Sequence, residues 1–164
     1  KGLSVQASLA GDSFQSGYRE QLEKWLKQQN LDGEVQFVGQ LERKALARFY
    51  ALHHVGVFPS IHQEAFGIVG AEMMASGLAL VSSGVGGAGE LIDDGLTGLR
   101  FQAGDSQDLA RCLMRLATDT TLLNGLSQTG QRFAQQRFSV KASAKALEAG
   151  FSRNAAQGDE TIIF

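Results

Sequence analysis

The sequence has a single cysteine, a single proline and no long apolar run. One cysteine excludes an intrachain disulfide, and Cys112 has no C-x-x-C partner for a zinc site. Its place in the helix-like stretch DLARCLMRLA predicts a small buried hydrophobe rather than a nucleophile. This thiol usage suits a reducing cytoplasm. No apolar run reaches the roughly 18–20 residues that span a bilayer, and no charged-then-apolar leader opens the sequence, so we expect no transmembrane segment and no export.

An excess of basic charge is also missing. Seventeen acidic residues stand against fifteen basic ones, for a net charge of −2. Neither nucleic acid nor an anionic membrane is therefore an expected partner. Hydrophobic residues make up 43% of the 164 and charged residues 20%, the balance of a globular protein with one core. We expect one domain over residues 1–151 and a tail over residues 152–164.

Glycine, with 20 residues, is abundant, and the glycines lie between short apolar runs, which is typical of tight strand-to-helix turns. Strands and helices are expected to alternate as far as residue 101, and three helical stretches follow. The expected strands are 4–11, 34–39, 55–60, 78–83 and 97–101, and the expected helices are 17–30, 42–53, 68–76, 88–93, 106–119, 121–136 and 139–151. Trp25 lies on the apolar face of its helix and is expected to pack in the core. This pattern predicts an α/β fold, with a Rossmann-like parallel sheet flanked by helices and a helical C-terminal section.

In such sheets, ligands bind beyond the carboxyl ends of the strands. The loop SSGVGGAGELIDDG places Gly84, Gly86 and Gly89 as G-x-G-x-x-G, the fingerprint of a dinucleotide site. A dinucleotide site also needs a long helix and an acidic residue about 20 positions further on, whereas residues 93–95, Asp-Asp-Gly, end the helix here. Three interpretations stay open: a close-packed turn, a turn whose amides approach a phosphate or sugar, and a dinucleotide site. The residues at 93–95 are interpreted as a turn, not a metal site, and Arg100 as a surface cation.

The stretch PSIHQEAFGIVGAEMMASG carries two glutamates, Glu64 and Glu72, with seven residues between them. Glu64 lies in a loop, Gly67 allows a sharp turn, and Glu72 lies one turn inside the helix that begins near Ile68. A helix N-terminus offers unpaired amides and a positive dipole end, which suits a diphosphate. A carboxylate on the helix can accept ribose hydroxyls, and one before it can hold a sugar ring. A glutamate near a helix N-terminus is also common for the dipole alone.

The same stretch, continued through LALVSSGVGGAGELIDDGLTGLRF, resembles the C-terminal, nucleotide-sugar-binding half of retaining GT-B glycosyltransferases of the group 1, or family 4, type. These proteins carry two glutamates with seven residues between them around F-G, then A-x-G, a strand, G-G, E and D-G-x-x-G. The matching positions are Glu64, Phe66-Gly67, Glu72, Ala75-Ser76-Gly77, Gly86-Gly87, Glu90, Asp94-Gly95 and Gly98. The resemblance covers residues 3–151.

The resemblance implies a role for each candidate residue. Glu64 would be the catalytic residue beside the transferred sugar, and Glu72 would hold the ribose hydroxyls. The remaining donor-binding candidates are the helix-start segment Phe66, Gly67, Ile68 and Val69, the nucleobase pocket at Val38 and Gly39, Gly11 close to the donor, and His62 in the donor cleft. The donor would be a UDP-sugar, with UDP-glucose first and GDP-mannose next. No metal and no cofactor are expected.

Some family features are absent. Ala65 and Ala79 stand where the family often has glycine and proline. The first strand-helix segment, with its Gly-Arg and Lys, is missing, as is the N-terminal domain with the acceptor site and a catalytic histidine. We therefore expect a cytoplasmic donor-binding half, inactive alone, with peripheral membrane association of the full enzyme left open. The alternatives are a non-catalytic nucleotide-sugar-binding module and an NAD-type domain.

Overall fold

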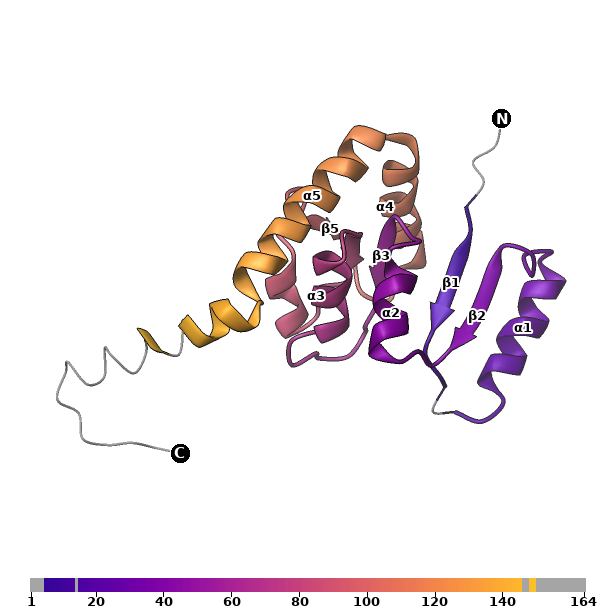
Figure 1. Ribbon diagram of the computed structural model, residues 1–164. Helices are drawn as coiled ribbons and strands as arrows, with labels where there is room; N and C mark the ends of the chain where they lie inside the picture. The colour runs from indigo at the N-terminus through magenta and orange to yellow at the C-terminus, as the bar shows by residue number, and fades with distance from the viewer. Residues whose placement is uncertain (1–4, 14, 146–147, 150–164) are drawn as a thin grey trace. The chain divides into compact units, whose positions relative to one another are not determined.

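The computed structural model describes residues 5–13, 15–145 and 148–149. The chain divides into two compact units, Lys1–Phe49 and Tyr50–Phe164, and each is described by itself (Figure 1). The expected tail, residues 152–164, lies outside the described residues, as do parts of the last expected helix, in which residues 140–145 and 148–149 are helical.

The first unit holds two parallel strands and a helix between them in sequence. These are β1 (Ala7–Ala10), α1 (Tyr18–Gln28) and β2 (Val35–Gly39). An ion pair of 2.9 Å joins Arg19 and Glu23, one turn apart on α1. The guanidinium of Arg19 also lies over the Phe37 ring of β2, 5.3 Å from its centroid, which ties the helix to the strand.

The expectation that Trp25 packs in a core is wrong, because its side chain is 52% exposed. Its neighbour Leu26 is the buried residue of α1. Adjacent helix positions point about 100° apart, and a pair of strands offers α1 a narrow apolar surface. Leu26 is 7% exposed, whereas Trp25 and Tyr18 face solvent.

In the sequence, α2 (Arg43–Tyr50) follows β2 and ends at the first residue of the second unit. The second unit is built on three parallel strands in the order β3-β4-β5. Its elements are β3 (Val55–Phe58), α3 (Ile68–Ala75), β4 (Ala79–Ser82), the 3-10 helix η1 (Gly87–Leu91), β5 (Gly98–Arg100), α4 (Ser106–Thr118) and α5 (Thr120–Arg137). Where a helix was expected over 88–93, the chain forms the shorter η1.

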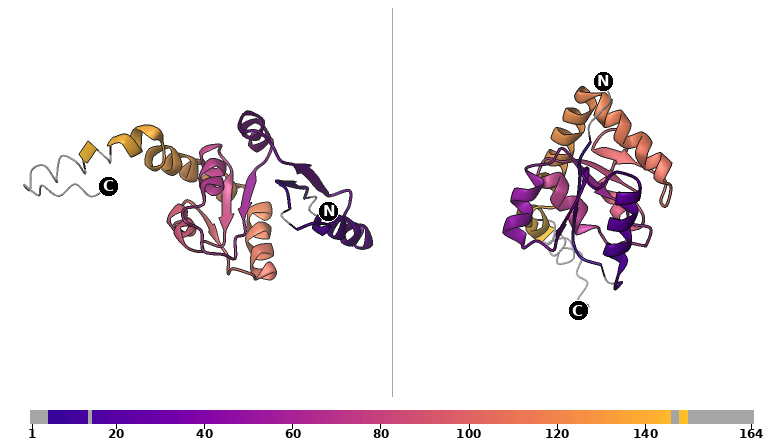
Figure 2. Two further views of the ribbon diagram at one scale, coloured as in Figure 1. Left: turned by 90° about the horizontal axis from the view of Figure 1, so that it is seen from below. Right: turned by 90° about the vertical axis from the view of Figure 1, so that its right-hand side faces the viewer.

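Every residue of the central strand β4 is buried, because helices cover both faces of this sheet (Figure 2). Val81 packs on one face with Leu99, Cys112 and Leu116, the last two from α4. Leu80 packs on the other face in a second cluster, with Ala71, Met74, Leu91, Ile92 and Ala134. The expected α/β class, with parallel strands flanked by helices, is confirmed. Within the described residues, no helix combines the length and apolarity needed to cross a membrane.

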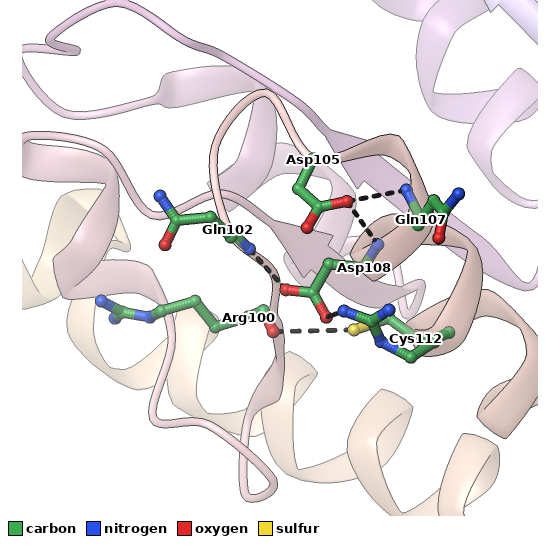
Figure 3. Close-up of polar contacts among 7 residues, drawn as sticks. Arg100, Gln102, Asp105, Gln107, Asp108 and Cys112 are labelled. Carbon is green, nitrogen blue, oxygen red and sulfur yellow. Dashed lines mark hydrogen bonds and ion pairs between the residues drawn. The ribbon is translucent and has the colours of Figure 1, made fainter.

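Cys112 is 5% exposed, as the sequence predicted, and its Sγ lies 3.6 Å from the carbonyl oxygen of Arg100 (Figure 3). Burial is the main cause that raises the pKa of this thiol, and the negative charge of Asp108 adds to the rise. A raised pKa leaves little reactive thiolate at neutral pH.

We expect slow reaction of Cys112 with a thiol reagent in the native protein and rapid reaction in urea, both followed by absorbance. Rapid native reaction would contradict the buried position.

Asp105 caps the N-terminus of α4 (Figure 3). Its Oδ1 accepts hydrogen bonds from the amides of Gln107 at 2.9 Å and Asp108 at 3.0 Å. Loss of such a cap costs about 1 kcal/mol, so Asp105→Ala is expected to lower the free energy of unfolding by that amount in urea. Gln107→Ala is the matched control, because it keeps the backbone donor. Equal stability of the two variants would contradict the cap.

Candidate functional site

Glu64 lies in the loop between β3 and α3 and is held at both its backbone and its carboxylate. The hydroxyl of Ser60 donates a hydrogen bond of 2.6 Å to Oε1 of Glu64. The Glu64 backbone pairs with Gly86 in a parallel bridge, and the Gly87 amide donates to the Glu64 carbonyl oxygen at 2.7 Å. The side chain is half-buried. The glycine loop after β4 therefore fixes the backbone from which Glu64 projects.

This close approach explains why residues 86 and 87 are glycines. A Cβ on Gly86 would lie 2.6 Å from the Glu64 carbonyl oxygen, and a Cβ on Gly87 would lie 2.1 Å from the Ala65 carbonyl oxygen. Gly86 also adopts a positive φ of 65°, which side-chain-bearing residues rarely adopt. The pair of glycines lets two backbones touch, and the touching partner is the loop that carries Glu64.

The other two glycines of the fingerprint also face internal contacts. A Cβ on Gly84 would lie 3.0 Å from the guanidinium carbon of Arg100, and one on Gly89 would lie 3.0 Å from the Gly84 carbonyl oxygen. The segment that follows is a 3-10 helix of five residues rather than a long helix. Packing inside the second unit thus accounts for all three glycines of G-x-G-x-x-G, which favours the close-packed turn.

Arg100, expected from the sequence to be a surface cation, also forms hydrogen bonds to the backbone of the glycine loop and of η1's end. Its Nη2 donates hydrogen bonds of 3.0 Å to the carbonyl oxygens of Gly89 and Ile92. Its backbone amide donates to Oδ1 of Asp94 at 2.8 Å. Arg100 therefore braces the glycine loop from the end of β5, and Asp94 acts within the turn. In the part of the chain that the structure describes, no cluster of three His, Cys, Asp or Glu side chains could hold a metal ion.

The N-terminus of α3 follows Glu64 after three residues. Gly67 precedes the helix in the left-handed region, with φ of 85°, and no side chain caps the helix. The first amides of a helix have no acceptor within it and lie at the positive end of its dipole. The side chains of Ile68 and Val69 are 64% and 43% exposed. This helix start is therefore open to solvent and suited to an anion.

Phe66 lies between Glu64 and the helix start, and its ring points into the protein. It packs edge-to-face against Phe138, with ring centroids 5.0 Å apart. Phe138 packs in the same way on Phe133 of α5. Phe66 therefore anchors the loop to the end of α5 through its side chain. His62 is exposed on the same loop.

Glu72 is half-buried on α3, one turn beyond the helix start. Its neighbour is Tyr50, which is 5% exposed at the end of α2. Burial raises the pKa of Tyr50 above its ordinary value, and the negative charge of Glu72 raises it further. Sequence reasoning did not single out Tyr50, since a tyrosine in an amphipathic helix carries no sign of its partner.

The remaining candidates belong to the first unit. The Gly11 amide donates to the Gly39 carbonyl oxygen at 2.8 Å, where β1 and β2 end. Gly11 and Gly39 both adopt positive φ, 126° and 69°. Val38 is half-buried beside them. The structure thus brings Gly11, Val38 and Gly39 together in one unit, and Glu64, the helix start of α3 and Glu72 together in the other.

A hollow of about 420 Å³ lies at the carboxyl ends of β4 and β5, and neither Glu64 nor Glu72 is among the residues that line it. It is lined by Ser83, Val85, Asp94, Arg100, Phe101, Gln102, Ala103 and Asp108. The backbone amide of Gln102 donates a hydrogen bond of 2.7 Å to Oδ2 of Asp108 (Figure 3). This bond is the main cause that holds the pKa of Asp108 below its usual value, and Arg111 lowers that pKa further. The stability from this lowered pKa is present above the ordinary carboxyl pKa and is lost as pH falls through the lowered value.

Comparison with known proteins decides the family. Residues 3–133 match the family described as glycosyl transferases group 1. The chain belongs to this family. A D-inositol 3-phosphate glycosyltransferase of Saccharomonospora viridis is 33% identical over 117 residues, which cover 71% of this chain and 27% of that relative. The sequence resemblance to a group 1 glycosyltransferase domain is thus confirmed.

Solved structures agree on the GT-B fold. The crystal structure of Anabaena HepE in complex with UDP-glucose has a TM-score of 0.81 and 28% identity, covering 91% of this chain and 41% of that one. The C-terminal domain of the group 1 glycosyl transferase LpcC from Francisella tularensis, 21% identical, has a TM-score of 0.72 and is covered over 86% of its length. The chain spans 41% or less of the curated relative and of the HepE structure.

Proposed function

We propose that this chain is the donor-binding half of a retaining glycosyltransferase that moves a hexosyl group from a nucleoside-diphosphate sugar, with UDP-glucose as the first donor to test. The observation that carries the proposal is the continuous arrangement of Glu64, the uncapped α3 N-terminus and Glu72. HepE, which is similar to this chain, has been crystallised with UDP-glucose. The arrangement supplies, in order, groups for a sugar, a diphosphate and a ribose.

The diphosphate would bind at the N-terminus of α3. The amides of Gly67, Ile68 and Val69 would donate to its oxygens, and the positive end of the helix dipole would favour their charge. When the bond from the sugar to the diphosphate breaks, negative charge grows on the leaving oxygen. Amides already fixed in a helix stabilise that charge without reorganising, which is an electrostatic contribution to catalysis.

The two glutamates would act on either side of this diphosphate. Glu72, one turn into α3, would accept hydrogen bonds from the ribose hydroxyls. Glu64 would hold the transferred sugar at its reacting face, with His62 beside it in the donor cleft. In the first unit, the strand ends at Gly11, Val38 and Gly39 would contribute to the nucleobase pocket through backbone groups.

The acceptor site and a catalytic histidine would come from an N-terminal GT-B domain, as the family resemblance implies. The coverage of the relatives, 27% and 41%, leaves room for such a domain. The chain alone would then bind nucleotide and transfer nothing. A cytoplasmic reaction without metal or cofactor is part of this proposal.

A calorimetric titration of the chain with UDP, GDP, ADP and NAD tests the proposal. Saturable binding of one nucleoside diphosphate, with NAD silent, would support a donor site and name its base. Binding of NAD alone would contradict the proposal and would favour a dinucleotide site at the glycine loop. Absence of all binding would contradict a nucleotide site in this chain.

A further inference from the structure

The structure also assigns a function to Ser60: we infer that Ser60 is a positioning residue, which aims the carboxylate of Glu64 at the sugar of the donor. This inference rests on the proposed function for Glu64. It starts from two hydrogen bonds. The Ser60 hydroxyl donates to Oε1 of Glu64 at 2.6 Å, and the Ser60 carbonyl oxygen accepts from the hydroxyl of Ser83 at 2.5 Å.

Ser83 makes the support for Ser60 rigid. It lies directly after the buried strand β4 and is itself 7% exposed. Its hydroxyl crosses from β4 to the loop after β3, a contact between residues 23 positions apart. The backbone of Ser60 is thereby tied to the core of the second unit, and its hydroxyl starts from a fixed point.

Ser60 holds one end of Glu64, and the glycine loop holds the other. The Gly86 and Gly87 contacts fix the Glu64 backbone, but a glutamate has three further rotatable bonds between that backbone and its carboxylate. The bond from Ser60 to Oε1 restricts those rotations. Among the residues that the structure describes, no other donor contacts this carboxylate, so Oε2 is left for a ligand.

The bond has a direction that suits this role. A carboxylate accepts, and the short distance of 2.6 Å fits a hydroxyl donating to an ionised oxygen. The same hydroxyl lies 3.4 Å from the His62 carbonyl oxygen, a longer and weaker contact. The single hydroxyl proton of Ser60 is therefore engaged by Glu64 and is not free for the donor. Ser60 acts through Glu64, so loss of its hydroxyl would lower the affinity for the sugar part of the donor but not for the nucleotide part.

The first experiment needs no ligand. The melting temperatures of the full chain are compared for the original protein, Ser60→Ala, Glu64→Ala and the double variant. If the side chains are bonded, the double variant falls by less than the sum of the two single falls. Strict additivity would overturn the inference at its first step.

The second experiment measures dissociation constants for UDP and for UDP-glucose by calorimetry with the same variants. Ser60→Ala is expected to weaken the binding of UDP-glucose by about three- to tenfold, the scale of one ordinary hydrogen bond, because Ser60 acts on the sugar only through Glu64. The binding of UDP is expected to stay unchanged. Ser60→Thr, which keeps the hydroxyl, is expected to restore UDP-glucose binding. Ser127→Ala is the matched control, since Ser127 is also half-buried and donates to a backbone oxygen, that of Gly77, at 2.6 Å.

The outcomes separate this inference from the proposed function. If Glu64→Ala weakens UDP-glucose and Ser60→Ala does not, Ser60 is no positioning residue, and the function of Glu64 stands. If Ser60→Ala weakens UDP and UDP-glucose equally, its effect is on the fold, and the inference is overturned. If Glu64→Ala changes neither ligand, the proposed function of Glu64 fails and the inference fails with it, even when the melting temperatures are non-additive.

Discussion

Replacing Glu72 with alanine is expected to weaken UDP binding by about 1.5–3 kcal/mol, the range for a hydrogen bond to a charged group. That is roughly a 10- to 150-fold rise in the dissociation constant. The reason is that a carboxylate one turn inside α3 can accept two ribose hydroxyls, and alanine accepts none. Calorimetry on the full chain measures the difference.

Glu90→Ala is the matched control for this substitution. Glu90 is an exposed glutamate of the second unit, and its ion pair with Arg137 is long, at 4.0 Å. Such surface pairs contribute little, so Glu90→Ala should leave UDP binding unchanged. An unchanged affinity in Glu72→Ala would refute the ribose assignment. A larger loss of affinity in a Gly86 variant than in Glu72→Ala would point back to the glycine loop as the nucleotide site.

Glu72→Ala can also be tested without a nucleotide, through its effect on Tyr50. The negative charge of Glu72 contributes to the raised pKa of Tyr50, so Glu72→Ala should lower the pKa of Tyr50, while the effect of burial remains. The chain has two tyrosines, and Tyr18 lies in the other unit. A spectrophotometric titration of phenolate absorbance therefore resolves the shift. An unchanged titration would mean that the two side chains do not interact.

Much of the fold could be predicted because its signals are local. Short apolar runs bounded by glycine predicted the strands, and the order of strand and helix predicted the parallel class. The spacing of Glu64 and Glu72 around Gly67 likewise predicted a loop followed by a helix start, and the structure has that arrangement. Each of these features is encoded within a dozen residues.

The supports of the site could not be predicted in this way. Ser83 meets Ser60 across 23 positions, and Arg100 reaches back 11 positions to Gly89. No local pattern marks a serine or an arginine as the partner of a distant backbone oxygen. The predicted burial of Trp25 was wrong for a related reason. Periodicity gives the apolar side of a helix but not the width of the surface that this side covers.

Gly87→Ala is expected to destabilise the protein by about 1–3 kcal/mol, the usual cost of overpacking. Gly87 does not need a positive φ, so the cost comes from contact alone. The added Cβ would lie 2.1 Å from the carbonyl oxygen of Ala65, a backbone atom that no rotamer change can move aside. Urea unfolding, followed by circular dichroism, measures the loss.

Gly125→Ala provides the opposite case in the same protein. Gly125 lies inside α5, and a Cβ there would meet nothing within 4 Å. Alanine in a helix interior is favoured over glycine by roughly 0.5–1 kcal/mol, so this variant should be more stable than the original. A Gly87→Ala protein as stable as the original would mean that the two loops separate easily. The amide of Gly87 also holds the Glu64 backbone through a hydrogen bond to its carbonyl oxygen. Gly87→Ala should therefore weaken the binding of UDP-glucose more than the binding of UDP.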